Sequence, residues 1–105
     1  MGTCDTKTLR EEAEQLFERG DKTGALEALE RLHEQYPDDP DVLSDLGTVC
    51  FALERRRDSM LHLARAVELC PEHDEARRNL QMVCKSVGTT PEKALEWART
   101  ASQAQ

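Results

Sequence analysis

The chain of 105 residues is long enough for one domain with a modest core, but too short for a deep catalytic cleft between two domains. It contains four aromatic residues, five glycines and four prolines, and its richness in Ala, Leu, Glu, Gln and Arg favours helices over strands. The net charge of −7 comes from residues 1–52, which carry 13 acidic and 5 basic side chains, so we expect no binding to nucleic acid or to anionic membranes.

The first part of the chain is predicted to form two helices, over residues 6–19 and 22–36. Apolar residues in the first helix recur with the i, i+4, i+7, i+8 spacing of one helix face. Between the two helices, Gly20 provides a left-handed end for the first, and Asp21 provides an N-cap for the second. We therefore expect a helical hairpin.

A second pair of helices is predicted over residues 40–53 and 56–70. Asp39 is an N-cap for the first of them, and Pro40 occupies the first helical position, where its missing N–H costs nothing. A third pair is predicted over 74–86 and 91–103, with Pro91 in the same position as Pro40.

Three consecutive arginines, Arg55, Arg56 and Arg57, occupy the turn between the third and fourth helices. Two interpretations stay open. The arginines either form a solvated turn that is capped by Asp58, or they contact an acidic partner.

The chain repeats itself at an interval of 34 residues, since Pro37 and Pro71 each follow a helical pattern at that separation. The shift superimposes apolar and small residues, pairing Leu9 with Leu43, Ala13 with Gly47, Leu16 with Cys50, Ala25 with Ser59, Leu29 with Leu63, and Leu32 with Ala66. A second shift pairs Leu46 with Leu80 and Cys50 with Cys84. Because two helices cross closely only where one of them offers a small residue, the recurring small residues indicate that these columns lie at the helix contacts. We therefore expect the column residues Leu46, Cys50, Leu63 and Ala66 to be buried.

These columns resemble the tetratricopeptide repeat, a helix-turn-helix unit of 34 residues with small and large apolar residues at fixed positions. The second unit matches best, through Leu46-Gly47, Ser59, Leu63, Ala66 and Pro71. The third matches least, because Arg77 and Gln81 replace an apolar and a small residue. The resemblance implies an all-α fold: three stacked antiparallel helix pairs forming a right-handed superhelix, or α-solenoid. The single domain 1–105 would hold repeats at about 6–39, 40–73 and 74–105.

The resemblance also implies a concave groove, lined by the first helix of each pair, that holds a segment of a partner protein. The candidate groove residues are Arg10, Glu14, Asp41, Asp45, Thr48, Phe51, Arg78, Asn79, Met82 and Lys85. Carboxylates dominate one end of this set, and Phe51 and Met82 are its apolar anchors. The predicted partner is therefore a protein or peptide segment with basic and apolar side chains.

The last helix is expected to be the least covered, because members of this family commonly close the stack with an additional helix that this sequence lacks. Leu95 and Trp97 are then partly exposed, and an exposed apolar patch favours association. We predict weak homo-association through residues 91–103.

No catalytic residue, metal site or cofactor site is predicted. The histidines His33, His62 and His73 have no partner at metal spacing and are expected on solvated helix faces or at helix starts. The four cysteines, Cys4, Cys50, Cys70 and Cys84, are expected to be reduced, with Cys50 and Cys84 packed as small hydrophobes. The chain is predicted not to be an enzyme.

Two functions from different classes remain. The chain is either an adaptor or scaffold that binds proteins, or a regulatory or targeting segment of a larger enzyme, such as a transferase with helical repeats. No apolar run approaches the roughly 20 residues that span a bilayer, and we expect a cytoplasmic protein.

Overall fold

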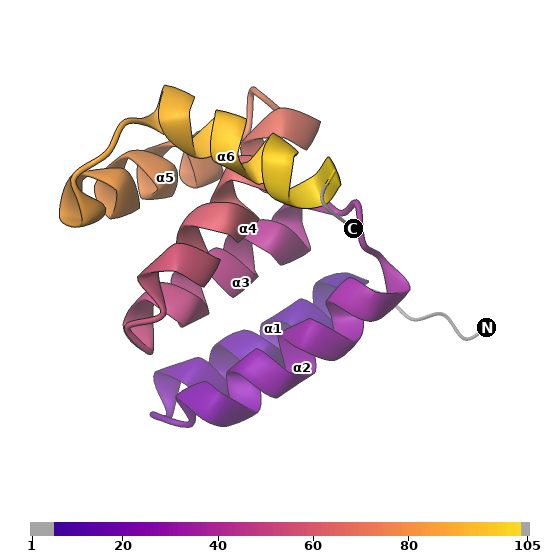
Figure 1. Ribbon diagram of the computed structural model, residues 1–105. Coiled ribbons are helices and arrows are strands. Elements are labelled where there is room, and N and C mark those ends of the chain that lie inside the picture. The colour runs from indigo at the N-terminus through magenta and orange to yellow at the C-terminus, as the bar shows by residue number, and fades with distance from the viewer. Residues whose placement is uncertain (1–5, 104–105) are drawn as a thin grey trace.

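A computed structural model of the chain describes residues 6–103, which form six helices and no strand (Figure 1). The helices are α1 (Thr6–Glu18), α2 (Lys22–Gln35), α3 (Pro40–Ala52), α4 (Arg56–Leu69), α5 (Asp74–Val87) and α6 (Pro91–Gln103). Every helix begins at the predicted residue and ends within one residue of the predicted end. Cys4 lies outside the described residues.

Side-chain caps fix where several helices begin. Asp21 accepts a hydrogen bond from the backbone N–H of Gly24 (2.9 Å), and Asp39 accepts one from Asp41 (2.9 Å). The Nδ1 atom of His73 accepts one from Ala76 (3.1 Å), so this histidine caps α5. These bonds satisfy backbone donors that have no partner inside the helix.

The start of α4 differs from the other capped starts, and the prediction that Asp58 caps this turn is wrong. The N-cap residue is Arg55, which makes no side-chain capping bond, and Asp58 lies inside the first turn of the helix. A carboxylate at that position favours the helix through its dipole, without accepting a capping hydrogen bond.

The turn inside each helix pair contains one residue with left-handed backbone, and these residues are 34 positions apart. They are Gly20 (φ 93°), Glu54 (φ 63°) and Gly88 (φ 88°). Glycine adopts this conformation freely, whereas a residue with a Cβ atom pays about 1–2 kcal/mol. The middle repeat therefore makes the same turn as its neighbours at a conformational cost.

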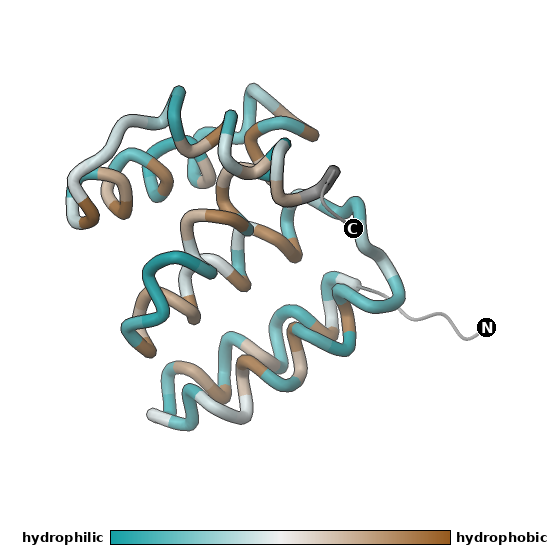
Figure 2. Tube along the Cα trace, in the orientation of Figure 1, coloured by the Kyte–Doolittle hydropathy of each residue, from teal (hydrophilic) through white to brown (hydrophobic). Residues whose placement is uncertain are grey.

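The repeat columns form the core, as predicted: Leu46, Cys50, Leu63 and Ala66 are all buried. Figure 2 shows hydrophobic and hydrophilic residues alternating along the helices, as amphipathic helices require. One buried cluster joins α1, α2 and α3, and a second joins α4, α5 and α6. Leu95 and Trp97 pack against the second cluster and are partly exposed, which confirms that prediction.

The closest pair is α3 with α4. A Cβ atom at Gly47 would collide with the side chain of Leu63, and the Ser59 hydroxyl donates a 2.6 Å hydrogen bond to the carbonyl oxygen of Gly47. The third pair is looser, because α6 contacts α4 more extensively than it contacts α5 (Figure 1). None of the described helices has the length and apolarity needed to cross a membrane.

Candidate functional site

A hollow of about 490 Å³ lies on the side of the array formed by α1, α3 and the start of α5. Residues Lys7, Arg10, Glu11, Ala13, Glu14, Phe17, Glu18, Leu29, Asp45, Thr48, Val49 and Glu75 line it. We call this hollow the groove. Its lining comes from the first helix of each pair, with Leu29 of α2 as the exception, so its position agrees with the expected concave face.

The floor of the groove is apolar. Ala13, Leu29 and Val49 are buried members of the first core cluster, and Phe17 packs against them while remaining partly exposed. Phe17 therefore belongs both to the contact between the first two repeats and to the groove surface. A partner side chain entering the groove would meet methyl groups and an aromatic ring.

One arginine on the groove wall is held by two carboxylates. Arg10 Nε lies 2.7 Å from Asp45 Oδ2, and a second nitrogen donates to Asp45 Oδ1 at 3.4 Å. A third nitrogen of the same guanidinium lies 3.7 Å from Asp41 Oδ2. The fork of Arg10 is thus directed at carboxylates of α3 rather than at the open groove.

The pKa values of this pair reflect opposing causes. Burial raises the pKa of Asp45, although the hydrogen bond and positive charge of Arg10 oppose that rise. Burial lowers the pKa of Arg10, but the hydrogen bond and charge of Asp45 outweigh it, so the net direction is upward. The charge of Glu75 further raises the pKa of Asp45, which indicates that the groove wall is negative around the pair.

Asp41 extends the ion pair to the third repeat. Its Oδ1 atom lies 2.8 Å from Nε2 of His73. Because Nδ1 of the same ring accepts the backbone N–H of Ala76, the Nε2 atom carries the proton in neutral His73 and donates it to Asp41. Side chains therefore connect α1, α3 and α5 in one continuous network.

Four further carboxylates border the groove and are all exposed: Glu11, Glu14, Glu18 and Glu75. Within residues 6–103 no ion pair involves any of them. Lys7 is the one other cation of the lining, so with Arg10 already paired the rim of the groove carries an excess of negative charge.

The structure brings together part of the predicted groove set. Arg10, Glu14, Asp45 and Thr48 line the groove. Asp41 and Asn79 adjoin it, through the contact of Asp41 with Arg10 and the 3.3 Å hydrogen bond from Asn79 Nδ2 to Thr48 Oγ1. The remaining four, Phe51, Arg78, Met82 and Lys85, are not in its lining.

Eight lining residues were absent from the predicted set, and Leu29 and Val49 are two of them. Both are apolar at helical spacing, a signal that identifies core positions but does not distinguish a core residue from the floor of an adjacent hollow. Ser44, one residue before Asp45 on α3, does not reach the groove surface and is buried, at 1% exposure.

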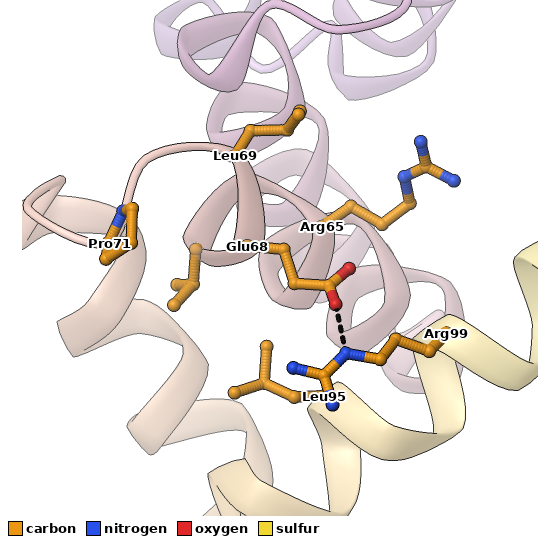
Figure 3. A pocket seen from close by; sticks show the side chains of 7 residues that line it. Arg65, Glu68, Leu69, Pro71, Leu95 and Arg99 are labelled. Atoms are coloured by element: carbon orange, nitrogen blue, oxygen red, sulfur yellow. Dashed lines mark hydrogen bonds and ion pairs between the residues drawn. The ribbon is translucent and has the colours of Figure 1, made fainter.

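A second hollow of about 460 Å³ lies between α4, the turn that follows it, and α6 (Figure 3). Its lining residues are Arg65, Val67, Glu68, Leu69, Pro71, Leu95 and Arg99. Arg99 Nε donates to Glu68 Oε2 at 2.5 Å across its edge. This ion pair attaches α6 to α4, and Leu69 and Leu95 give the hollow an apolar surface.

The histidines are less exposed than predicted. His33 and His62 are both partly buried, and their rings meet edge to face with centroids 5.8 Å apart, which joins α2 to α4. Solvated faces for these two residues were therefore a wrong prediction, whereas His73 does lie at a helix start. In the described part of the chain, no group of three or more His, Cys, Asp or Glu residues could hold a metal ion.

Cys50 and Cys84 are buried free thiols, as predicted. Burial raises the pKa of Cys50 to about 11, with a smaller contribution from the negative charge of Asp58. A thiol with that pKa is almost entirely protonated near neutral pH, and the thiolate is the reactive form. Cys50 therefore acts in packing.

Comparison with known families gives one match: residues 7–49 fit the family model described as tetratricopeptide repeat. The match covers the first repeat and most of α3, and the six helices fit a repeat array of that type. No curated protein matches the chain.

Proposed function

We propose that this chain, a helical array of the tetratricopeptide-repeat type, is a protein-interaction module that binds a basic and partly apolar segment of another protein in the groove. Repeats of this family serve as interaction modules rather than as catalysts. The finer statement, that the partner segment is basic and apolar, rests on the chemistry of the groove lining.

The observation that carries the proposal is the combination of an apolar floor with unpaired carboxylates at the rim. Phe17 and Leu29 offer apolar contact, and Glu14 and Glu18 lie beside them without an ion-pair partner in the described residues. Arg10 adds no free positive charge, because its guanidinium faces Asp45 and Asp41. Such a surface attracts Lys and Arg side chains and repels a carboxylate-rich segment.

The test is calorimetric titration with two peptides of equal length: one with Lys and Arg flanking Leu and Phe, and one with Glu and Asp in place of the cations. The E14Q/E18Q variant should bind the basic peptide about threefold to tenfold more weakly, since each exposed ion pair contributes roughly 0.2–1 kcal/mol. The matched control is E27Q/E34Q, which removes the same charge from exposed positions on α2.

Binding of the basic peptide should weaken as salt rises, because exposed charges are screened over about 8 Å at physiological ionic strength. Equal losses in both double variants would show that only the overall charge matters and would contradict the groove assignment. Weak self-association through residues 91–103 stays a prediction, and sedimentation at increasing protein concentration measures it.

A further inference from the structure

The turn between α3 and α4 carries a second charged surface, opposite in sign to the groove rim. Arg55, Arg56 and Arg57 are all exposed, and the guanidinium groups of two of them lie over aromatic rings. The guanidinium carbon of Arg56 lies 5.9 Å from the centroid of the Phe51 ring, and that of Arg57 lies 5.6 Å from the Trp97 ring. Both distances are within the range of a cation–π contact.

The ring contacts limit where these arginines lie. A guanidinium has five N–H donors in one plane, and a ring accepts none of them as a carboxylate would, so they stay available to a partner. Arg56 is fixed further, because its Nε atom donates to the hydroxyl of Ser86 at 3.1 Å. That bond leaves its terminal nitrogens available, apart from a contact with Glu54 at 4.0 Å between exposed groups. The arrangement suits a planar carboxylate, which two parallel N–H groups can bind together.

The backbone holds the turn in place. Glu54 adopts the left-handed backbone conformation that Gly20 and Gly88 adopt in the other repeats. The backbone N–H of Arg55 donates to the carbonyl of Cys50 at 2.8 Å, and that of Glu54 donates to Phe51 at 3.0 Å. The arginines are therefore mounted on an ordered turn rather than on a loose loop.

An exposed apolar side chain lies beside the arginines. Met82 is 49% exposed and is one helical turn before Ser86 on the same face of α5. Lys85 is exposed next to Ser86. The acidic groups nearest in sequence are Glu54 and Asp58, so the turn carries three positive charges against two negative ones.

We propose that this surface, formed by Phe51, Arg56, Met82, Ser86 and Trp97 together with Arg57, docks an acidic segment of a protein partner. Carboxylate side chains of the segment bind the exposed guanidinium groups of Arg56 and Arg57, and an apolar side chain of the segment contacts Met82. Charge complementarity selects this occupant, because the exposed cations Arg55, Arg56, Arg57 and Lys85 outnumber the carboxylates of the turn, Glu54 and Asp58. The proposal does not depend on the groove proposal, since the two surfaces share no lining residue.

The single tryptophan of the chain reports on this site directly. A peptide of Asp and Glu residues around a central Leu, without tryptophan, is titrated into the full chain while Trp97 emission is recorded. The Trp97 emission is expected to change and to reach saturation as peptide is added. R56Q/R57Q should weaken binding about tenfold, as loss of two charge-assisted contacts predicts. The control R19Q/R31Q removes the same charge at exposed positions on other segments and should stay within about twofold of the parent.

Replacement with lysine separates charge from stacking. R56K/R57K keeps both positive charges but loses the planar fork, so binding should weaken at least about threefold. E14Q/E18Q, which alters the groove alone, should leave acidic-peptide binding unchanged or slightly stronger. Circular dichroism melting of each variant confirms that the fold is intact.

Several results would overturn the proposal. One is an equal loss of binding in R56Q/R57Q and R19Q/R31Q, which would reveal long-range charge alone. A second is self-association that disappears in both R56Q/R57Q and E14Q/E18Q, which would place the arginine turn in the groove of another copy. A third is single-stranded DNA that binds more tightly than the peptide and depends on the same arginines.

Discussion

The second and third helix pairs share the repeat pattern but pack differently, and α6 begins 17 residues after the start of α5, whereas α4 begins 16 residues after the start of α3. In the second pair, Gly47 faces Leu63 and Ser59, and α3 lies close against α4. One repeat later, Gln81 occupies the position of Gly47, and Ala94 occupies that of Ser59, because α6 begins one residue late relative to the 34-residue repeat. Gln81 is exposed and offers no small residue for a close crossing, and α6 packs on α4 rather than closely on α5.

The difference shows which columns decide the geometry of a repeat. Buried apolar residues recur in both pairs: in the third repeat Leu80 and Val83 are large ones, and Ala94 is a small one. The small residue of the first helix does not recur, since Gln81 stands in place of Gly47, and the close crossing is lost with it. Burial of apolar area makes the helices associate, while one small residue determines how near they come.

Removing the largest side chain at the tight crossing should have the greatest effect. Leu63 is 0% exposed, and L63A should destabilise the domain by about 2–5 kcal/mol through lost burial and the remaining cavity. The matched control L69A truncates a leucine that is 43% exposed and should cost far less. Thermal melting measures both, and similar melting temperatures would show that the repeat columns are misassigned.

Acid should weaken the contact between the first and second repeats. Burial and the neighbouring charge of His33 lower the pKa of His62 to about 4; the charge of Arg65 lowers it further, whereas that of Asp58 raises it. The unfolded chain has the ordinary pKa of about 6.5, so it takes up the proton first. The stability that comes from keeping His62 neutral in the folded state is therefore complete above about pH 6.5. It is lost as the pH falls toward 4, and the free energy of unfolding decreases by roughly 2–3 kcal/mol.

Urea unfolding of the parent and of H62Q at several pH values tests this expectation. The parent should lose stability between pH 6.5 and 4, and H62Q should lose less over the same range. Both proteins share the carboxylate titrations at lower pH, so the difference between the two curves isolates the histidine. Parallel curves would refute the assignment.

Adding one methyl group should distinguish the two crossing points. G47A places a Cβ atom against Leu63, which is fully buried, and should cost about 1–3 kcal/mol through overpacking. Q81A changes the equivalent position of the third repeat, which is exposed, and should be neutral or slightly stabilising because alanine favours helices. A stable G47A protein would mean that the tight crossing is not required.

The smallest expected effect concerns the left-handed turns. E54G should stabilise the domain by about 0.5 kcal/mol, since glycine removes the steric cost but adds freedom to the unfolded chain. G20A should destabilise it by about 1 kcal/mol, because space for the Cβ atom is available there and only the backbone conformation is unfavourable. Chemical unfolding measures the free energy of unfolding of each variant, and we expect it to rise in E54G and to fall in G20A. Changes of the same sign would contradict the assignment of a conformational cost to the left-handed backbone.

Much of the fold was predictable because it depends on local signals. Asp39, Pro40 and Pro91 determine helix starts through rules that act within one turn, and the predicted starts were confirmed. The left-handed Glu54 was not predicted, although its alignment with Gly20 and Gly88 held the signal. The conformational propensity of glutamate argues against a left-handed backbone at position 54. The surrounding helices override this preference of one residue.

The site was less predictable because it depends on which side chains find one another. Arg10 and Asp45 were both assigned to partner binding, but they bind each other across 35 positions of sequence. Phe51 was assigned to the groove and instead carries Arg56 above its ring. Repeat columns give the helix face on which a residue lies, and the side-chain rotamers that complete such pairs are decided only by the packed structure.

The network of Arg10, Asp41, Asp45 and His73 has a mechanical consequence. It ties one helix of each repeat to the next, so sliding of one repeat past another would have to break a charged contact. An array restrained in this way resists changes of curvature and twist between its repeats. A partner segment that binds along the array would meet repeats that are already held in position. The array would therefore lose little conformational entropy on association. A cation of the partner that competed with Arg10 for Asp45 would also release this restraint, and binding would then soften the array along its length.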